Sequence, residues 1–245
     1  MGLFRKKVSA EIDINNIPEH IAIIPDGNRR WAAKRKLPKE VGHREGSYNF
    51  KRIVIECSKL GVKYITFYAF STENWSRDKK EVDALMGLML NFLRNAEKEI
   101  DGNNVVIRVI GDRSRLSDEL KNEIIRVEKL TSVNTGIILN LAINYGGRME
   151  ITNAVKEIAK DVKNNKITVN QIDEELIDSY LYTKDCPAPD LFIRTSGEMR
   201  ISNYLLWQMA YTELWFTDLL WPDFNVNELK KAIHDFQNRD RRLGG

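Results

Sequence analysis

The sequence predicts an α/β protein: a single domain with a mostly parallel central sheet of about six strands flanked by helices. Short runs rich in β-branched and aromatic residues alternate along the chain with amphipathic segments. Strands and helices that alternate in this way are typical of parallel sheets covered on both faces. The chain has 245 residues, of which 42% are hydrophobic, and this is enough for one large buried core.

Six runs have the length and composition of strands. They are rich in Ile, Leu, Val, Phe and Tyr, and polar or glycine-containing segments follow most of them. The predicted strands are His20–Ile24, Val62–Phe70, Val105–Ile110, Ile137–Ile143, Leu191–Arg194 and Leu214–Thr217.

Helix-capping residues mark three of the helices between and after these strands. The predicted helices are Arg44–Leu60, Asp78–Ile100 and Leu229–Asn238. Gly61 suits the position just after a helix, because glycine readily adopts the left-handed conformation. Asp78 with Glu81, and Asn225 with Glu228, have the spacing of capping boxes.

Charge and cysteine content exclude several protein classes. The net charge of +3 is too small to imply a nucleic-acid partner by itself. Cys57 and Cys186 are the only cysteines, too few for a disulfide scaffold or a zinc framework. Carboxylates interrupt the most apolar stretch, Tyr204–Phe224, so we expect it to belong to the core rather than to a membrane. We expect a cytoplasmic protein.

Polar segments rich in arginine or glycine follow five of the predicted strands. They read PDGNRR, STENWSR, GDR, NYGGR and TSGEMR in chain order. In open α/β sheets, ligands bind at the carboxyl ends of the strands. We therefore expect these segments to surround the functional site.

The segment Asp26-Gly27-Asn28 has two interpretations. Asp, Gly and Asn favour turns, and Asp or Asn can cap the helix that follows. Cations are dense between Arg29 and Arg44, however, which favours an anion site over a plain turn. Exposed amides at Gly27 and Asn28 would then face a diphosphate, Arg30 would grip it, and Asp26 would hold Mg²⁺.

Two further segments are individually ambiguous. The sequence RTSGEMRISN offers Arg194, Ser196, Arg200 and Ser202 either to a second diphosphate or to ordinary salt bridges. The helical stretch Leu85–Leu93 is apolar on nearly all sides, which suits either a fully buried helix or the wall of an apolar tunnel.

Several motifs of other enzyme classes are missing. The sequence contains no Gly-x-x-x-x-Gly-Lys-Ser/Thr phosphate loop, no Gly-x-Ser-x-Gly nucleophile elbow and no Cys/His metal spacing. A Mg²⁺-dependent phosphoryl transferase could still use Asp26 and the nearby arginines. A regulatory partner subunit and an RNA-binding module are the non-enzymatic alternatives, and the even charge balance disfavours RNA.

The motifs, in their order along the chain, resemble those of the cis-prenyltransferase family, most closely its bacterial undecaprenyl diphosphate synthases. The resemblance extends from His20 to Gly245 and rests on HIAIIPDGNRRWA, GHREG, YAFSTENWSR, INYGGR, RTSGEMRISNYLLWQMAYTELWFTDLLWPDF and RDRRLGG. It implies a catalytic domain over residues 19–245, preceded by an extension of residues 1–18. It also implies the family's fold, with a hydrophobic tunnel beside the sheet.

The family pattern implies a role for individual positions. Asp26 is the implied essential Mg²⁺ ligand, Glu213 a second metal-associated carboxylate, and Asn74 a residue that assists proton removal. The positions implied for the allylic diphosphate pocket are Gly27, Asn28, Arg29, Arg30, Trp31, Lys39, His43, Ser71, Thr72, Glu73, Trp75 and Arg77. Those implied for isopentenyl diphosphate are Arg194, Arg200, Ile201 and Ser202. Arg242 and Gly244 match an Arg-x-Gly ending that reaches the neighbouring subunit's site in this family.

The resemblance implies a Mg²⁺-dependent condensation. Isopentenyl diphosphate is added repeatedly to farnesyl diphosphate, giving a long-chain polyprenyl diphosphate. The expected product is undecaprenyl diphosphate, the lipid carrier precursor for peptidoglycan; a shorter or longer cis-polyprenyl product is the alternative. A homodimer is implied, as is transient membrane contact for product release. Arg29 and Lys39 depart from common family variants, and Lys39 replaces a bidentate guanidinium with a point charge.

Overall fold

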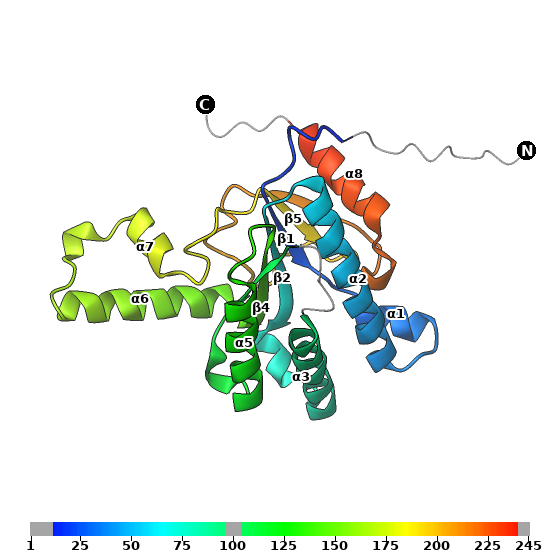
Figure 1. Cartoon of the computed structure of the whole chain (residues 1–245), viewed down its shortest axis with the longest axis horizontal. Coiled ribbons are helices and arrows are strands. Elements are labelled where there is room, and N and C mark those ends of the chain that lie inside the picture. Colours follow the sequence, from blue (N-terminus) through cyan, green and yellow to red (C-terminus); the bar gives the residue numbers. More distant parts are fainter. Residues whose placement is uncertain (1–11, 97–103, 240–245) are drawn as a thin grey trace, which may run out of the picture.

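One parallel sheet forms the centre of the protein, whose residues 12–96 and 104–239 are described by a computed structural model (Figure 1). The strand order is β3-β4-β2-β1-β5-β6, and all five pairings are parallel. The strands are β1 (His20–Ile24), β2 (Tyr64–Ser71), β3 (Val106–Ile110), β4 (Ile138–Tyr145), β5 (Leu191–Arg194) and β6 (Glu213–Phe216). The predicted sheet is confirmed, with strand ends within two residues of the predicted ones.

Helices and short 3-10 turns connect the strands. In the described residues the helices are α1 (Asn28–Lys34), α2 (Lys39–Leu60), α3 (Lys79–Arg94), α5 (Asp118–Thr131), α6 (Gly147–Lys163), α7 (Glu174–Tyr180) and α8 (Val226–Gln237). The 3-10 turns are η1 (Thr72–Ser76), η2 (Arg113–Arg115), η3 (Val169–Gln171) and η4 (Trp221–Asp223). The predicted single-domain α/β architecture is confirmed; the domain boundary at residue 19 stays a prediction.

Three helix ends differ from the predicted ones by three residues or more, and one of them is the start of α8, at Val226 rather than Leu229. Helix α2 begins at Lys39, directly after Pro38, so part of the basic segment is helical rather than loop. Helix α3 ends at Arg94, not at Ile100, because the Asn95 side-chain amide bonds the Asn91 carbonyl at the helix end. Residues 97–103 lie outside the described residues.

The predicted capping residues have a mixed outcome. Asp78 caps α3 by accepting a hydrogen bond from the Lys80 amide, and Asn225 caps α8 in the same way from two amides. Glu81 does not complete a capping box with Asp78, because its carboxylate pairs with Lys39 and Arg77. Glu81 therefore connects α3 to basic side chains rather than to the helix cap.

The two faces of the sheet carry different coverings. Ile21 and Ile23 of β1 belong to a core shared with residues of α2, α3, α5 and α8. Ala22 and Ile24, which alternate with them, belong to a smaller core that includes Tyr204 and neighbouring residues from the segment after β5. Helices α6 and α7 form an arm that extends away from the sheet (Figure 1).

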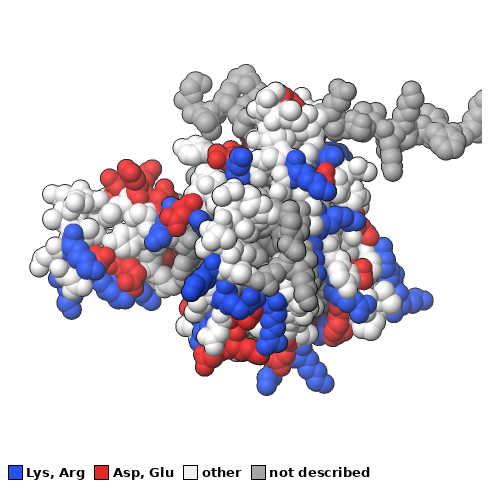
Figure 2. Space-filling view, in the orientation of Figure 1, with Lys and Arg blue, Asp and Glu red and all other residues white. Residues whose placement is uncertain are grey.

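Charges of both signs are mixed over the surface. On the face drawn in Figure 2, the arm carries acidic side chains along α7 and both acidic and basic ones along α6. The body below the sheet shows Lys and Arg next to Asp and Glu, in keeping with the net charge of +3. None of the helices in the described ranges combines the length and apolar character needed to cross a bilayer.

The topology places a crevice at the end of β1. The chain moves from β1 to β2 on one side, while β5 and β6 lie on the other. Ligands of open α/β sheets bind at such switch points, outside the carboxyl ends of the strands. Ile24, the last residue of β1, pairs with Arg194, the last residue of β5, so the segments after both strands meet there.

His20 opens β1 in a fully buried polar environment. Its Nδ1 lies 2.7 Å from the Pro187 carbonyl oxygen and its Nε2 lies 2.7 Å from Thr66 Oγ1. Burial lowers the pKa of His20 to about 4, against the raising effects of the Pro187 hydrogen bond and the Asp190 charge. The folded protein therefore keeps this imidazole neutral at mildly acidic pH.

This burial predicts a stability loss in mild acid. Below pH 6.5 the unfolded chain protonates His20 before the folded chain does, so stability falls with pH until the folded pKa of about 4 is reached. The loss between pH 7 and pH 5 amounts to about 2 kcal/mol. Urea unfolding at both pH values should show a correspondingly smaller loss for His20→Gln. Equal losses in both proteins would contradict the assignment.

Candidate active site

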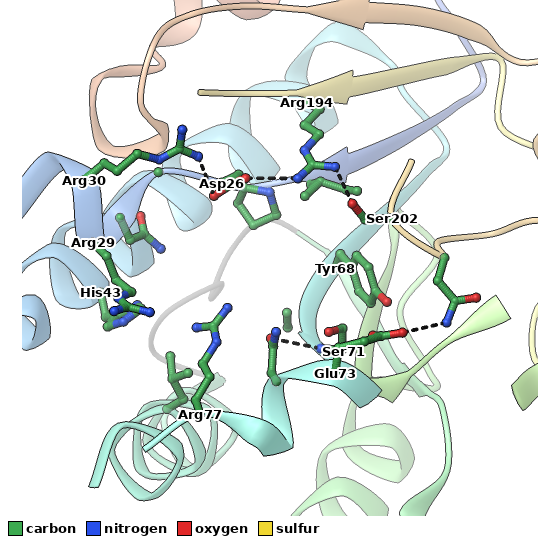
Figure 3. Close-up of a pocket in the computed structure, with 18 residues that line it drawn as sticks. Asp26, Arg29, Arg30, His43, Tyr68, Ser71, Glu73, Arg77, Arg194 and Ser202 are labelled. Carbon is green, nitrogen blue, oxygen red and sulfur yellow. Dashed lines mark hydrogen bonds and ion pairs between the residues drawn. The ribbon is translucent and has the colours of Figure 1, made fainter. Parts of the chain in front are cut away.

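A cavity of about 730 Å³ opens at the carboxyl ends of β1, β2 and β5 (Figure 3). Twelve of the residues singled out from the sequence line it: Asp26, Gly27, Asn28, Arg29, Arg30, His43, Ser71, Glu73, Asn74, Arg77, Arg194 and Ser202. Figure 3 shows Arg29, Arg30 and His43 on one side of Asp26 and Arg194 with Ser202 on the other. The cavity thus has two cationic sides separated by one carboxylate.

Asp26 lies between two guanidinium groups. Its Oδ1 is 3.2 Å from Arg30 Nη2, and its Oδ2 accepts a 3.1 Å hydrogen bond from Arg194 Nη2. Burial alone would raise the pKa of Asp26, but the hydrogen bonds and charges of Arg194 and Arg30 outweigh it and hold the pKa below its ordinary value. The side chain is 31% exposed, so an ionised carboxylate faces the cavity.

Arg194 is almost fully buried and holds three segments together. Besides Asp26, it donates to Ser202 Oγ at 2.6 Å and to the Arg200 carbonyl oxygen. Its Nε has no hydrogen-bond partner, although buried donors are normally satisfied. Ser202, Asn203 and Leu205 have positive φ angles of 48°, 60° and 44°, so the segment after β5 is held in an unusual conformation.

The donor set fits a magnesium ion that arrives with a phosphorylated ligand. Among residues 12–96 and 104–239, no group of three or more His, Cys, Asp or Glu side chains could hold a metal. Mg²⁺ does not require such a cage, because one or two carboxylates, waters and substrate phosphates usually complete its octahedron. The ionised carboxylate of Asp26, facing the cavity, is a ligand of this kind.

Glu81 is a buried carboxylate that gathers four basic side chains. Its oxygens lie 3.2 Å from Lys39 Nζ, 3.0 Å from Arg77 Nη1, 3.8 Å from Arg29 Nη1 and 3.6 Å from His43 Nε2. Burial would raise the pKa of Glu81, but Lys39, Arg29 and Arg77 lower it overall, so the carboxylate is ionised. It ties the first turn of α3 to α1 and α2.

His43 is held neutral within this cluster. Burial lowers its pKa, and the nearby Glu81 only partly opposes that effect. His43 Nε2 has no hydrogen-bond partner, and neither has the buried Asn28 Oδ1 on the same side of the cavity. Unpaired buried polar atoms are rare, and here both belong to residues that line the cavity.

Two glycines one helical turn apart explain the GHREG motif. A Cβ at Gly42 would lie 2.2 Å from the Asn28 carbonyl oxygen, and one at Gly46 would lie 2.4 Å from Asn28 Oδ1. Only glycine therefore allows α2 to approach the start of α1 this closely. The contact fixes Asn28, and with it the first turn of α1, beside Asp26.

The turn after β2 is internally capped. Asn74 Oδ1 accepts a 3.2 Å hydrogen bond from the Ser71 amide and closes a capping box around η1. Trp75 donates from Nε1 to Asn144 Oδ1 at 2.7 Å, and its ring packs on Phe70. Asn74 lines the cavity, whereas Trp75 and Thr72 are not among its lining residues.

An apolar recess of about 130 Å³ adjoins the cavity. The two share Pro25, Asn28, His43, Ala69 and Leu85 in their walls. Helix α3 contributes Leu85, Leu88, Met89, Phe92 and Leu93, and β2, β4 and Trp221 supply much of the remainder. One side of α3 thus lines an apolar space, while Val82, Phe92 and Leu93 also belong to the larger core; the tunnel itself stays a prediction.

Several predicted site residues lie beside the cavity rather than in its wall. Trp31 donates to Asp223 Oδ1 at 2.8 Å, with the Arg35 guanidinium 4.1 Å from its ring centroid. Lys39 is engaged by Glu81. Arg200 forms an ion pair with Glu198, and Ile201 packs against the smaller core. Their predicted contacts with substrate are not tested by these positions.

The structure does not bring Glu213 to Asp26 within this chain. Glu213 pairs with Leu191 at the start of β5, whereas Arg194, the partner of Asp26, pairs with Phe216 at the other end. The Glu213 carboxylate accepts a 2.5 Å hydrogen bond from Arg239. Its association with the metal stays a prediction. Arg242 and Gly244 lie outside the described residues.

Sequence reasoning missed three residues of the site. Glu81 was assigned to a helix cap, although its position within the basic segment WSRDKKEVD was a signal for an ion-pair role. Tyr68 lines the cavity and stacks on Tyr204 at 4.4 Å, which the alternation along β2 could have indicated. Asn203 also lines the cavity, and it directly follows Ser202.

The close approach of α2 to Asn28 gives a matched pair of variants. We expect Gly42→Ala to lower activity at least tenfold and to destabilise the fold, because its Cβ meets a backbone oxygen at 2.2 Å. Gly87→Ala in α3 meets nothing within 4 Å, so it should be neutral or stabilise by up to about 1 kcal/mol. Thermal unfolding and initial rates measure both. Similar behaviour of the two variants would contradict the packing argument.

Comparison with known proteins gives consistent matches over nearly the whole chain. A family model described as "Putative undecaprenyl diphosphate synthase" matches residues 24–244. An isoprenyl transferase of Clostridium tetani is 52% identical over 235 residues, 96% of this chain and 92% of its own length. The isoprenyl transferase of Clostridium perfringens is 54% identical over 231 residues, 94% of this chain and 91% of its own.

Solved structures share the fold as well. Lavandulyl diphosphate synthase from Lavandula x intermedia, in complex with dimethylallyl diphosphate, is 39% identical and superposes with a TM-score of 0.91. A probable undecaprenyl diphosphate synthase from Campylobacter jejuni is 34% identical, with a TM-score of 0.77. Both matches cover 94% of this chain and 100% of the other. The chain therefore belongs to the undecaprenyl diphosphate synthase family and is a prenyltransferase.

Proposed function

We propose that this prenyltransferase condenses isopentenyl diphosphate repeatedly onto farnesyl diphosphate, with Mg²⁺ as cofactor and a new cis double bond at each step. The expected product is undecaprenyl diphosphate, which serves as the lipid carrier precursor for peptidoglycan. One observation carries the proposal: two cationic sides flank the ionised carboxylate of Asp26, and an apolar recess adjoins the cavity between them.

The allylic diphosphate is proposed to bind on the side of α1 and α2. Arg29, Arg30 and Arg77 can donate to its phosphate oxygens there, and His43 offers a neutral imidazole with an unpaired Nε2. The recess begins beside His43 and Asn28, so a prenyl tail could enter it directly from this position. The relative solved with dimethylallyl diphosphate, itself an allylic diphosphate, supports this class of substrate.

Isopentenyl diphosphate is proposed to bind on the side of β5. Arg194 is nearly buried and already oriented by Asp26 and Ser202, so it loses little freedom when it binds an anion. Ser202 adds a hydroxyl donor, and Arg200 can turn from Glu198 toward the ligand. Tyr68 lines the cavity on this same side, below Ser202 (Figure 3).

The chemistry separates into charge stabilisation and proton removal. Mg²⁺ bound at Asp26 would supply Lewis-acid stabilisation of the departing diphosphate. Arg30 and the other guanidinium groups stabilise the charge that develops on the leaving oxygens. The released diphosphate can accept the proton that condensation sets free. Asn74 is neutral and already accepts from the Ser71 amide, so its proposed part is to orient the groups around that proton.

Product length depends on how well the apolar recess binds the growing chain. Burying a methylene is worth about 0.8 kcal/mol, so each five-carbon unit adds at most about 3 to 4 kcal/mol. Product release should then become slow and should be accelerated by detergent or a lipid bilayer. A shorter or longer cis-polyprenyl product is the alternative to the undecaprenyl chain.

The proposal also covers the oligomeric state, domain bounds and localisation of the enzyme. We propose a homodimer in which the Arg-x-Gly ending, with Arg242 and Gly244, reaches the neighbouring subunit's site. The catalytic domain is proposed to span residues 19–245, with residues 1–18 as an extension. A cytoplasmic enzyme that touches the inner face of the membrane during release fits the expected product.

Product analysis tests the function directly. The purified protein is incubated with farnesyl diphosphate, labelled isopentenyl diphosphate and Mg²⁺, and the products are separated by chromatography. We expect a cis-polyprenyl diphosphate and diphosphate release only when both substrates are present, and no turnover in excess EDTA. A burst of product followed by a slower, detergent-sensitive rate would support slow release. Absence of condensation, or consumption of a nucleotide instead, would refute the proposal.

Replacement of Asp26 tests the central carboxylate. Asp26→Ala should lower the rate at least a thousandfold, about 4 kcal/mol of barrier, because it removes the metal ligand. Arg194 keeps Ser202 Oγ and the Arg200 carbonyl as acceptors, so the fold should persist. Circular dichroism and thermal unfolding provide the control. A rate near that of the wild type would remove Asp26 from the mechanism.

A further inference from the structure

Three segments at the edge of the cavity meet at Asn203. Its backbone oxygen accepts a 2.7 Å hydrogen bond from the Gly147 amide, and its Oδ1 accepts a 2.9 Å bond from the Arg148 amide. Its Nδ2 donates to Glu73 Oε1 at 2.9 Å. One residue therefore connects the segment after β5 with the start of α6 and with the η1 turn.

Asn203 acts as a cap for α6 from outside the helix. The residue at the N-cap position, Gly146, has no side chain to accept from the first amides. Asn203 accepts from the first two, which would otherwise lack partners. A Cβ at Gly146 would lie 2.7 Å from Thr72 Oγ1 and 2.8 Å from Asn203 Nδ2, so glycine is needed where the three segments converge.

The hydrogen bond from Asn203 to Glu73 controls a negative charge at the cavity wall. Glu73 lines the cavity on the side of Tyr68 and Ser202 (Figure 3). Burial would raise the pKa of Glu73, but hydrogen bonds, first of all that from Asn203, lower it, so the carboxylate is ionised. The Asn203 amide holds this carboxylate near the α6 N-terminus, where the helix dipole favours a negative charge.

We propose that Asn203 is a positioning residue for the second diphosphate. By holding Glu73 against α6, it keeps an anion out of the space beside Arg194 and Ser202, and it fixes the η1 turn relative to that space. The inference rests on the proposed function, because it assigns this side of the cavity to isopentenyl diphosphate. It predicts that substitution of Asn203 raises KM for isopentenyl diphosphate far more than KM for farnesyl diphosphate.

The Asn203→Asp variant separates positioning from simple capping. Asp is as good a helix cap as Asn, and its carboxylate can still accept from the Arg148 amide. A merely structural role therefore predicts an unchanged enzyme. The variant loses the donor to Glu73, however, and places two carboxylates together, so Glu73 should turn toward the cavity. We expect KM for isopentenyl diphosphate to rise at least tenfold and KM for farnesyl diphosphate to change less than threefold.

A second substitution should rescue the first. Glu73→Gln restores a donor on the other side of the pair, so its amide can donate to the new carboxylate at position 203. It also removes the charge that would repel the diphosphate. We expect the double variant Asn203→Asp/Glu73→Gln to return KM for isopentenyl diphosphate to within threefold of Glu73→Gln alone. A KM that stays as high as in Asn203→Asp would overturn the proposal.

Asn104 provides a matched control at the other end of the strands. It also has a positive φ angle, 51°, and it also donates to one partner, Thr135 Oγ1, while accepting from the Thr135 amide. Asn104→Asp makes the same chemical change away from the cavity and should leave both KM values unchanged. Gly146→Ala, whose Cβ displaces the Asn203 amide, should raise KM for isopentenyl diphosphate as Asn203→Asp does.

A measurement without turnover distinguishes this inference from the proposed function. Amide hydrogen exchange of η1 should be faster in Asn203→Asp than in the wild type, and slow again in the double variant. If the variants show this exchange pattern but the wild type catalyses no condensation, the proposed function is refuted, while the positioning of η1 by Asn203 is retained. An active enzyme in which neither exchange nor KM changes with Asn203→Asp would overturn the inference.

Discussion

The ion pair between Asp26 and Arg194 is the contact on which the site depends. The parallel register of β1 and β5 sets Ile24 beside Arg194, so the carboxylate that follows β1 meets a guanidinium at the end of β5. A buried guanidinium without a partner would be strongly unfavourable. Asp26 bonds the Nη2 of Arg194, and Ser202 with the Arg200 carbonyl bonds its Nη1, which leaves the Nε of Arg194 without a partner. The same contacts that stabilise Arg194 also position it for an anion.

Glu81 has a comparable part on the other side of the cavity. The cations of Lys39, Arg77 and Arg29 would repel one another around an empty pocket, and a single buried carboxylate offsets that repulsion. Both sides of the cavity are thus ordered before any ligand binds. Groups that are already oriented lose less entropy on binding and need less reorganisation during reaction.

The sequence predicts the sheet well because strand cores are local, continuous apolar runs, such as His20–Ile24. It also predicts that the loops at the carboxyl ends of the strands form the site, because ligands of open α/β sheets bind there. It misjudges Glu81, since capping spacing and a long-range ion pair look identical along a chain. It likewise cannot place Glu213 relative to Asp26, because strand register decides which end of β6 faces the cavity. Contacts between segments far apart along the chain, such as those of Asn203, leave no periodic pattern in the sequence.

The left-handed backbone of Ser202, Asn203 and Leu205 connects the cavity wall with the smaller core on one face of the sheet. Such conformations cost of the order of 1 to 3 kcal/mol each, and packing must compensate for them. Here the compensation comes from Tyr204 and Leu205, both fully buried in the smaller core. Substitutions of Tyr204 or Leu205 would thus change the shape of the cavity wall at Ser202 and Asn203, although neither residue lines the cavity itself.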